Sequence, residues 1–116
     1  MTTTALDVIT LGETMVSFAA HEAGTLEDAA TFTKIVAGAE SNVGVGLARL
    51  GLKVAWVSRL GADSFGRYIR RALEAEGIDC TAVATDTTRP TGFMLKSRAL
   101  EGQDPVVEYF RRGSAA

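Results

Sequence analysis

The sequence predicts an α/β fold built on a parallel sheet, and three observations indicate it. Residues 7–12 and 53–60 form apolar runs with many β-branched residues, as strands buried on both faces do. Residues 32–37 also have a strand pattern, and a helix pattern separates them from the run at 53–60. A strand, a helix and a second strand in this order join parallel strands through a right-handed crossover.

Three strands are expected before residue 40. The apolar run at 7–12 ends at Gly12, and residues 15–19 have the pattern of a second strand. Residues 21–30 are polar, and we expect them to form a loop. The third strand, at 32–37, alternates apolar and polar residues, which is typical of a strand with one face in water.

A turn of small residues follows the third strand and leads into a helix. Three apolar residues recur at the spacing of one helical face: Val43, Leu47 and Leu50. Gly51 is suited to the position just after the helix, where the backbone commonly turns left-handed. Gly44 and Gly46 are each about 1 kcal/mol poorer than alanine inside a helix. We therefore expect close packing of this helix to offset their cost.

A second helix is expected at 64–76, after the strand at 53–60 and a short turn. Asp63 or Ser64 is suited to cap its first turn, and Gly77 is suited to end it. Its apolar face holds three residues: Phe65, Ile69 and Leu73.

Three further strands are expected in the remainder of the chain, at residues 81–85, 91–98 and 106–112. The connection between the last two contains Gly102 and Asp104, which favour a reversal of the chain. The last two strands are therefore expected to form a hairpin.

The composition excludes several classes of protein. The 116 residues are 47% hydrophobic and 22% charged, as in one globular domain. A net charge of −2 argues against a surface that binds nucleic acid or an anionic membrane. No apolar run approaches the roughly 18 residues of a spanning helix, and residues 1–5 show no secretory signal, so we expect a cytoplasmic protein. The single Cys80 excludes an intrachain disulfide and a cysteine cluster for zinc, and we expect it to be a packing residue.

Two nucleotide-binding patterns are not met. Gly44 and Gly46 are spaced as in the glycine-rich turn of dinucleotide-binding proteins, but Arg49 stands where that pattern needs a third small residue. No Gly-Lys-Ser or Gly-Lys-Thr sequence occurs, which excludes a P-loop in this chain.

Two segments resemble the signatures of one enzyme family. The first is Gly38-Ala39-x-x-Asn42 followed by Leu47-Ala48-x-Leu50-Gly51, and the second is Leu60-Gly61-x-Asp63-x-x-Gly66. The pattern resembles the ribokinase-like (PfkB) carbohydrate kinases, and the likeness extends from residue 8 to residue 114. Within the family, the Gly-Ala-Glu-Ser-Asn core and the ending Tyr-Phe-Arg-Arg-Gly-Ser-Ala-Ala are most similar to the 2-keto-3-deoxygluconate kinases. The chain departs from the family at Ala37, where a glycine is usual, and at Gly44, where alanine is common.

The resemblance implies a ribokinase-like fold, in which a mostly parallel central sheet flanked by helices carries a small β-sheet lid over the sugar. Members of the family are longer, so we expect residues 1–116 to be the amino-terminal portion of one such domain, cut after Ala116. The lid strands are expected near residues 14–20, 31–37, 91–98 and 106–112. Exposed lid strands often pair between subunits, so we expect a homo-oligomer.

The resemblance also assigns substrate-binding roles to six residues: Gly38, Ala39, Asn42, Met94, Tyr109 and Arg111. Gly38 would allow the sugar to approach closely, and Asn42 would bond its hydroxyl groups. Met94 stands at a strand position where related kinases often have an aromatic residue. Tyr109 and Arg111 share one strand face, and the guanidinium fork suits a carboxylate. The residues alone favour plainer roles, with Asn42 at a helix start and Arg111 on an exposed strand edge.

The function that the resemblance implies is transfer of the γ-phosphoryl group of ATP, with Mg²⁺, to the sugar acid 2-keto-3-deoxygluconate. Ser17 stands where kinases of neutral sugars commonly have an aspartate, which weakens a fructokinase or ribokinase interpretation. The family's catalytic aspartate lies in a Gly-Ala-Gly-Asp motif that these 116 residues do not contain. We therefore expect no catalytic residue in this chain and a nucleotide site mostly outside it. Two alternatives stay open: another sugar or nucleoside kinase of this fold, and a non-catalytic module that binds a sugar acid.

Overall fold

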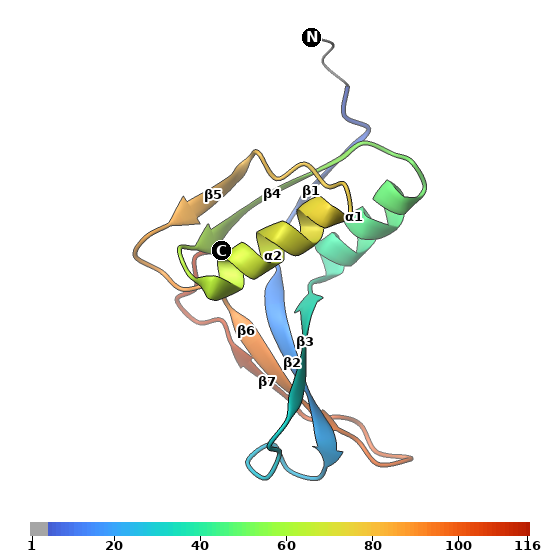
Figure 1. Ribbon diagram of the computed structural model, residues 1–116, viewed down its shortest axis with the longest axis vertical. Helices are drawn as coiled ribbons and strands as arrows, with labels where there is room; N and C mark the ends of the chain where they lie inside the picture. Colours follow the sequence, from blue (N-terminus) through green and yellow to red (C-terminus); the bar gives the residue numbers. More distant parts are fainter. Residues whose placement is uncertain (1–4) are drawn as a thin grey trace.

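The computed structural model describes residues 5–116 and divides them between two sheets and two helices (Figure 1). One sheet has three strands in the order β1-β4-β5, formed by Val8–Leu11, Val54–Gly61 and Val83–Asp86. All its strands are parallel, which confirms the α/β fold class predicted from the sequence. The predicted crossover between strands at 32–37 and 53–60 is wrong, because residues 32–37 lie in the other sheet. The expectation about a secretory signal concerned residues 1–5, and residues 1–4 lie outside the described part of the chain.

The second sheet has four strands in the order β3-β2-β6-β7. They are β2 (Met15–Ala23), β3 (Phe32–Ala37), β6 (Phe93–Arg98) and β7 (Val107–Phe110). The pair β2 and β6 is parallel, whereas β2 with β3 and β6 with β7 are antiparallel, so the predicted hairpin of the last two strands is confirmed. Figure 1 shows this sheet below α1 and the three-stranded sheet, extending away from them.

Strand β2 is longer than the sequence predicts, because it continues to Ala23. The loop expected at 21–30 is therefore wrong for its first three residues. Pairing partners explain the extension: the backbone N–H of His21 donates to the carbonyl of Thr31 at 3.0 Å, and Ala23 is paired with Arg98 of β6. Neighbouring strands thus hold a polar segment that has little strand propensity of its own.

Helix α1 (Ala39–Arg49) leads from the four-stranded sheet into β4. It ends as predicted at Gly51, whose φ of 90° lies in the left-handed region that favours glycine. Two backbone hydrogen bonds close this end, from Gly51 to the carbonyl of Ala48 and from Leu52 to the carbonyl of Leu47. This is the Schellman arrangement, which satisfies carbonyl groups that the helix leaves free.

The predicted apolar face of α1 is confirmed only at Leu47, which is half-buried and packs against the core. Val43 is 58% exposed and Leu50 is 79% exposed, whereas Ser41 and Gly44 are the buried residues. Small residues face the sheet because α1 lies close to it: a Cβ atom on Gly44 would be 3.5 Å from Val54. The expectation of close packing thus holds for Gly44 but not for Gly46, where an added Cβ would meet nothing within 4 Å.

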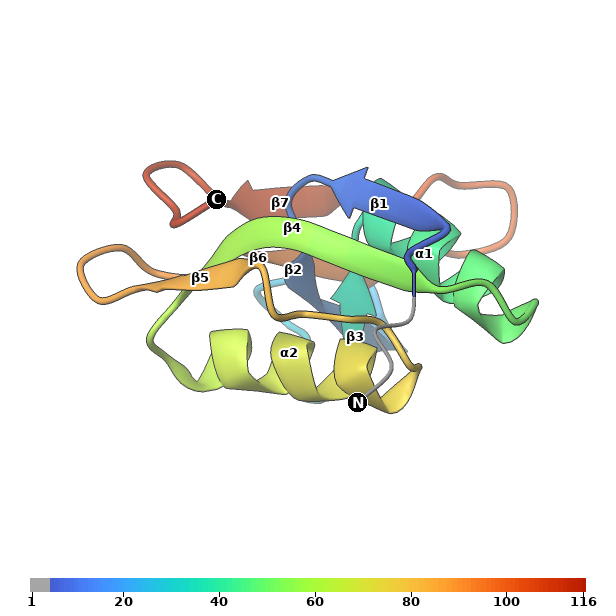
Figure 2. The same cartoon turned by 90° about the horizontal axis from the view of Figure 1, so that it is seen from above.

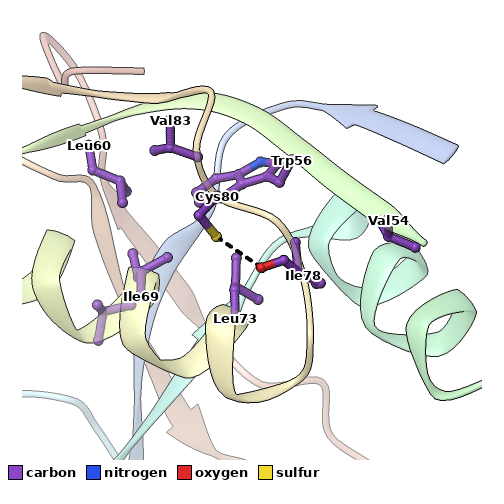
Figure 3. Close-up of a cluster of buried hydrophobic side chains, with 9 residues drawn as sticks. Val54, Trp56, Leu60, Ile69, Leu73, Ile78, Cys80 and Val83 are labelled. Carbon is purple, nitrogen blue, oxygen red and sulfur yellow. Dashed lines mark hydrogen bonds between the residues drawn. The ribbon is translucent and has the colours of Figure 1, made fainter. Parts of the chain in front are cut away.

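Helix α2 (Ser64–Ala75) runs along one face of the three-stranded sheet (Figure 2). Its Ile69 and Leu73 are fully buried and Phe65 is partly buried, which confirms the predicted apolar face. Figure 3 shows the core that they enter, formed with side chains of β4, β5 and the segment after α2: Val54, Trp56, Leu60, Ile78, Cys80 and Val83. Cys80 is a packing residue, as expected, and burial raises the pKa of its thiol to about 11.

No helix or strand among the described residues covers the opposite face of the three-stranded sheet, and its apolar side chains are exposed. Ile9 is 63% exposed and Leu11 is 72% exposed, so the prediction that the first apolar run is buried on both faces is wrong. The register explains the difference: Val8 and Thr10 are paired with Val54 and Trp56, which face the helices, and the alternate residues of β1 point away. No helix among residues 5–116 combines the length and the apolar character needed to cross a membrane.

Candidate functional site

Four segments that are distant in the sequence meet between the two sheets, and we call their contacting residues the junction: Glu13, Gly38, Gly92, Arg111 and Ser114. Glu13 lies in the β1–β2 loop, Gly38 in the turn before α1, Gly92 just before β6, and Arg111 and Ser114 after β7. A Cβ atom on Gly38 would lie 2.9 Å from the carbonyl oxygen of Glu13, and a Cβ atom on Gly92 would lie 2.9 Å from Oε2 of Glu13. Glycine at these two positions therefore lets the segments approach Glu13.

Arg111 forms an ion pair across the junction. Its Nη2 lies 2.9 Å from Oε1 of Glu13, and the Arg111 side chain is 54% exposed against 15% for Glu13. The guanidinium carbon also lies 5.9 Å from the centroid of the Tyr109 ring. The structure therefore places Arg111 near Tyr109 and leaves part of the guanidinium open to solvent. The strand predicted at 106–112 is shorter than expected, because β7 ends at Phe110 and Arg111 follows it.

A row of paired residues crosses the four-stranded sheet next to this arginine. Ser17 of β2 is paired with Met94 of β6, and Met94 is paired with Tyr109 of β7. Residues directly opposite one another on adjacent strands point to the same face of a sheet. Met94 is half-buried and Tyr109 is exposed, so the row extends from the sheet interior to its edge.

Two buried hydroxyl groups near the start of β2 have no hydrogen-bond partner within residues 5–116. Thr14 is 2% exposed and Ser17 is 1% exposed, and neither side-chain oxygen is bonded. A buried polar group without a partner costs about 1–3 kcal/mol. A ligand with hydroxyl groups that reached this part of the sheet would offset that cost.

The start of α1 lies between two shallow hollows. Ala39 lines a hollow of about 320 Å³ beside β1, together with Thr10, Leu11, Glu40 and Val43. Asn42 lines a different hollow of about 410 Å³ between α1 and α2, where Arg49 and Glu76 form an exposed ion pair. The structure thus brings Gly38, Tyr109 and Arg111 to or beside the junction, but it places Asn42 on the other side of the helix start from Ala39.

The segment Leu60-Gly61-x-Asp63-x-x-Gly66 has a structural role that the contacts explain. Asp63 caps α2 by accepting from the backbone N–H of Gly66 at 2.8 Å, and it accepts from both the backbone N–H and the hydroxyl of Thr91. Burial alone would raise the pKa of Asp63, but the hydrogen bonds from Thr91 and Gly66 outweigh it and lower the pKa below its ordinary value. A Cβ atom on Gly66 would lie 2.3 Å from the carbonyl oxygen of Gly61, so only glycine fits there.

Glu13 is the residue of this site that the sequence analysis missed. The sequence pattern assigns it no role, because it simply follows Gly12 at the end of the first apolar run. A usable signal was its position, because a carboxylate directly after a buried parallel strand lies at the carboxyl edge of the sheet, where ligand sites of α/β proteins form. Its partners, Arg111 and Ser114, are about a hundred residues away and carry no local pattern that links them to it.

Comparison with known proteins identifies the family of this chain. A family model described as pfkB family carbohydrate kinase matches residues 5–115. The 2-dehydro-3-deoxygluconokinase of Bacillus subtilis (strain 168) is 48% identical over 112 residues, which are 96% of this chain and 34% of that relative. The chain therefore spans about a third of the length of the curated relatives it matches.

Comparison with solved structures indicates the same family. A PfkB protein from Polaromonas sp. JS666 is 58% identical, with a TM-score of 0.92 over 97% of this chain and 37% of that one. An uncharacterized sugar kinase from Pyrococcus horikoshii in complex with ATP is 30% identical, with a TM-score of 0.85 over 93% of this chain and 35% of that one. These matches confirm the ribokinase-like fold expected from the sequence. The chain therefore belongs to the pfkB family of carbohydrate kinases.

Proposed function

We propose that this chain forms the substrate-binding part of a sugar kinase that transfers the γ-phosphoryl group of ATP to a hydroxyl of 2-keto-3-deoxygluconate. The observation that carries the proposal is the half-exposed guanidinium of Arg111 beside the exposed ring of Tyr109. A planar fork of N–H donors suits a carboxylate, which distinguishes a sugar acid from a neutral sugar. The identity of 48% to a 2-dehydro-3-deoxygluconokinase supports the same substrate.

The remaining predicted site residues complete the proposal. In the row formed by Ser17, Met94 and Tyr109, the half-buried Met94 and the exposed Tyr109 are proposed to provide a partly apolar surface for the C–H groups of a sugar, whereas the Ser17 hydroxyl is buried at the inner end of the row. Gly38, Ala39 and Asn42 are proposed to contact the sugar from the start of α1, where backbone N–H groups are free.

The four-stranded sheet is proposed to act as a lid over the bound sugar. Its outer strands β3 and β7 each have one edge without a partner strand in the described residues, so we also propose a homo-oligomer that pairs these edges. Sedimentation of the protein at several concentrations would test the assembly. A monomer at all of them would contradict it.

ATP and Mg²⁺ belong to the proposal for the whole enzyme. Phosphoryl transfer depends on positioning and on neutralisation of phosphate charge, normally by Mg²⁺. Among residues 5–116, no three His, Cys, Asp or Glu side chains gather in a way that could hold a metal ion. No residue of this chain is therefore assigned to the metal or to the nucleotide, and we expect the 116-residue chain alone to show no kinase activity.

The test replaces Arg111 in an enzyme that comprises this chain and the rest of the family fold. Arg111→Ala should lower kcat/KM for the sugar acid about 30-fold or more, because loss of a charge-assisted partner costs roughly 2 kcal/mol or more. Arg111→Lys should recover only part of the loss, because an ammonium group lacks the planar fork. A neutral analogue without the carboxylate should be a poor substrate for the parent and should change little in both variants.

Two outcomes would favour the alternatives. Equal losses on the acid and on the neutral analogue would mean that Arg111 supports the sheet and does not bind the carboxylate, and a panel of sugars and nucleosides would then identify the substrate. Binding of the sugar acid without turnover, in the same enzyme with ATP and Mg²⁺ present, would indicate a non-catalytic module.

A further inference from the structure

The carboxylate of Glu13 is held from several sides. Oε1 lies 2.9 Å from Nη2 of Arg111, and Oε2 accepts a hydrogen bond of 2.9 Å from the hydroxyl of Ser114. Ser114 is 6% exposed, and the Glu13 side chain is 15% exposed. The backbone of Gly92 lies against the same carboxylate, since a Cβ atom there would be 2.9 Å from Oε2. Glu13 therefore has little freedom to move.

Arg111 differs from Glu13 in this respect. Its side chain is 54% exposed and projects from the end of a short edge strand. A free arginine side chain samples many rotamers and loses that freedom when it binds a ligand. An ion pair with a fixed carboxylate restricts the arginine before the ligand arrives, and pre-organisation of this kind raises affinity without adding a contact to the ligand.

We propose that Glu13 is a positioning residue that holds one side of the Arg111 guanidinium, so that its other N–H donors face the carboxylate of the sugar acid. The inference rests on the proposed function, because it concerns the same arginine. Glu13 does not touch the substrate in this scheme. Its negative charge also offsets the positive charge of Arg111 when no substrate is bound.

A purely structural role is the competing explanation. Glu13 also bonds Ser114, and the turn from Arg111 to Ser114 is closed by a backbone bond of 3.1 Å. Ala115 is further tied to Pro90 by a bond of 2.8 Å from its N–H. Loss of Glu13 could therefore disturb the turn in general. Ser114→Ala is the matched control, because it removes the other bond of Glu13 and leaves the pair with Arg111.

Kinetics of the enzyme that comprises this chain and the rest of the family fold separate the two roles. Glu13→Ala should raise KM for the sugar acid about 3- to 10-fold, with kcat nearly unchanged. Without Glu13, the Arg111 side chain becomes ordered only when the substrate binds, and this loss of entropy weakens binding. Glu13→Gln keeps an oxygen acceptor and should recover part of the loss. The neutral analogue should be little affected, and Glu13→Ala should add nothing in an Arg111→Ala background. Ser114→Ala removes one contact of Glu13 but keeps the pair with Arg111, so it should raise KM for the acid less than Glu13→Ala does.

A second measurement does not depend on turnover. In the ¹⁵N-labelled 116-residue chain, the side-chain Nε–H signal of Arg111 should show restricted motion that is kept in Ser114→Ala and lost in Glu13→Ala. An equally mobile Arg111 in the parent and in Glu13→Ala would overturn the inference, as would equal KM effects on the acid and the neutral analogue. If instead Arg111→Ala shows no acid-specific loss, the proposed function fails, while the NMR comparison still decides whether Glu13 holds the arginine.

Discussion

Replacement of Asp63 should destabilise the protein more than its partly exposed position indicates. Asp63 accepts three hydrogen bonds, from Gly66 and from two groups of Thr91. Loss of the cap on α2 costs about 0.5–2 kcal/mol. Thr91 is 5% exposed, so its backbone N–H would stay buried without a partner, at about 1–3 kcal/mol. The sum for Asp63→Ala is a loss of roughly 1.5–5 kcal/mol in the free energy of unfolding.

Chemical unfolding of the 116-residue chain measures this loss directly. Trp56 is the single tryptophan and is 1% exposed, so its fluorescence reports opening of the core. Asp86→Ala is the matched control, because Asp86 also accepts three short-range hydrogen bonds, from two groups of Thr88 and from Arg89, but it is the last residue of β5 and these bonds are exposed to solvent. Water can replace those bonds, so the control should change the unfolding midpoint much less.

The pH dependence supplies a second check. The pKa of Asp63 is lowered in the folded state, so its contribution is complete above its unfolded pKa, which is about 3.9. The contribution is lost as the pH falls through the lower folded pKa. The difference in stability between the parent and Asp63→Asn should therefore be constant near neutral pH and should shrink below about pH 4. Equal losses for Asp63→Ala and Asp86→Ala, or a difference that does not change with pH, would refute the reasoning.

Two further predictions concern positions away from the junction. Gly46→Ala should stabilise the chain by about 0.4–1 kcal/mol in the same unfolding assay, because the added Cβ meets nothing within 4 Å. Gly66→Ala should instead destabilise the chain strongly, because its Cβ would lie 2.3 Å from the carbonyl oxygen of Gly61. Cys80 should react with a thiol reagent at pH 8 only after addition of denaturant, because burial raises its pKa to about 11 and keeps it protonated; fast reaction of the native chain would contradict this.

Local patterns predicted most elements of the fold, because the residues that determine each element are neighbours in the sequence. Asp63 and Gly77 mark the two ends of α2, and Gly51 ends α1, each through contacts within a few residues. The strand–helix–strand order predicted the α/β fold class but not the pairing, because β3 joins β2 in the four-stranded sheet and the parallel partners of β4 are β1 and β5. The apolar face of α2 was equally readable, since Ile69 and Leu73 are four residues apart and both buried.

Two of the wrong predictions concern which residues are buried. The period of Val43, Leu47 and Leu50 indicated a buried face, but α1 turns Ser41 and Gly44 toward the sheet. Hydrophobicity does not reveal this, because a glycine that permits close approach contributes no apolar area of its own. The exposed Ile9 and Leu11 show the same limit, since an apolar run predicts a buried strand without stating what buries it.

The candidate site was predictable only in part, because most of its contacts join residues that are distant in the sequence. The proximity of Tyr109 and Arg111 was expected from their spacing of two residues, although Arg111 lies just beyond the end of β7. The partner of Arg111 could not be read in the same way, because Glu13 reaches it only after both sheets have formed. The unpaired hydroxyl groups of Thr14 and Ser17 were also unpredictable, since a missing hydrogen bond depends on every neighbour in the fold.

The connection before β6 links the stability of the core to the geometry of the junction. Asp63 fixes Thr91 through two hydrogen bonds. The next residue, Gly92, packs against both Glu13 and Arg111: a Cβ atom on Gly92 would lie 2.9 Å from Oε2 of Glu13 and 3.4 Å from the Cα atom of Arg111. Movement of Thr91 would therefore displace the residue against which Glu13 and Arg111 are packed. A side chain that caps a helix on the far side of this connection thus acts on the proposed carboxylate site without touching it. Asp63→Ala should accordingly weaken the Glu13–Arg111 pair as well as the fold, whereas Asp86→Ala, at the end of β5, should leave the pair intact.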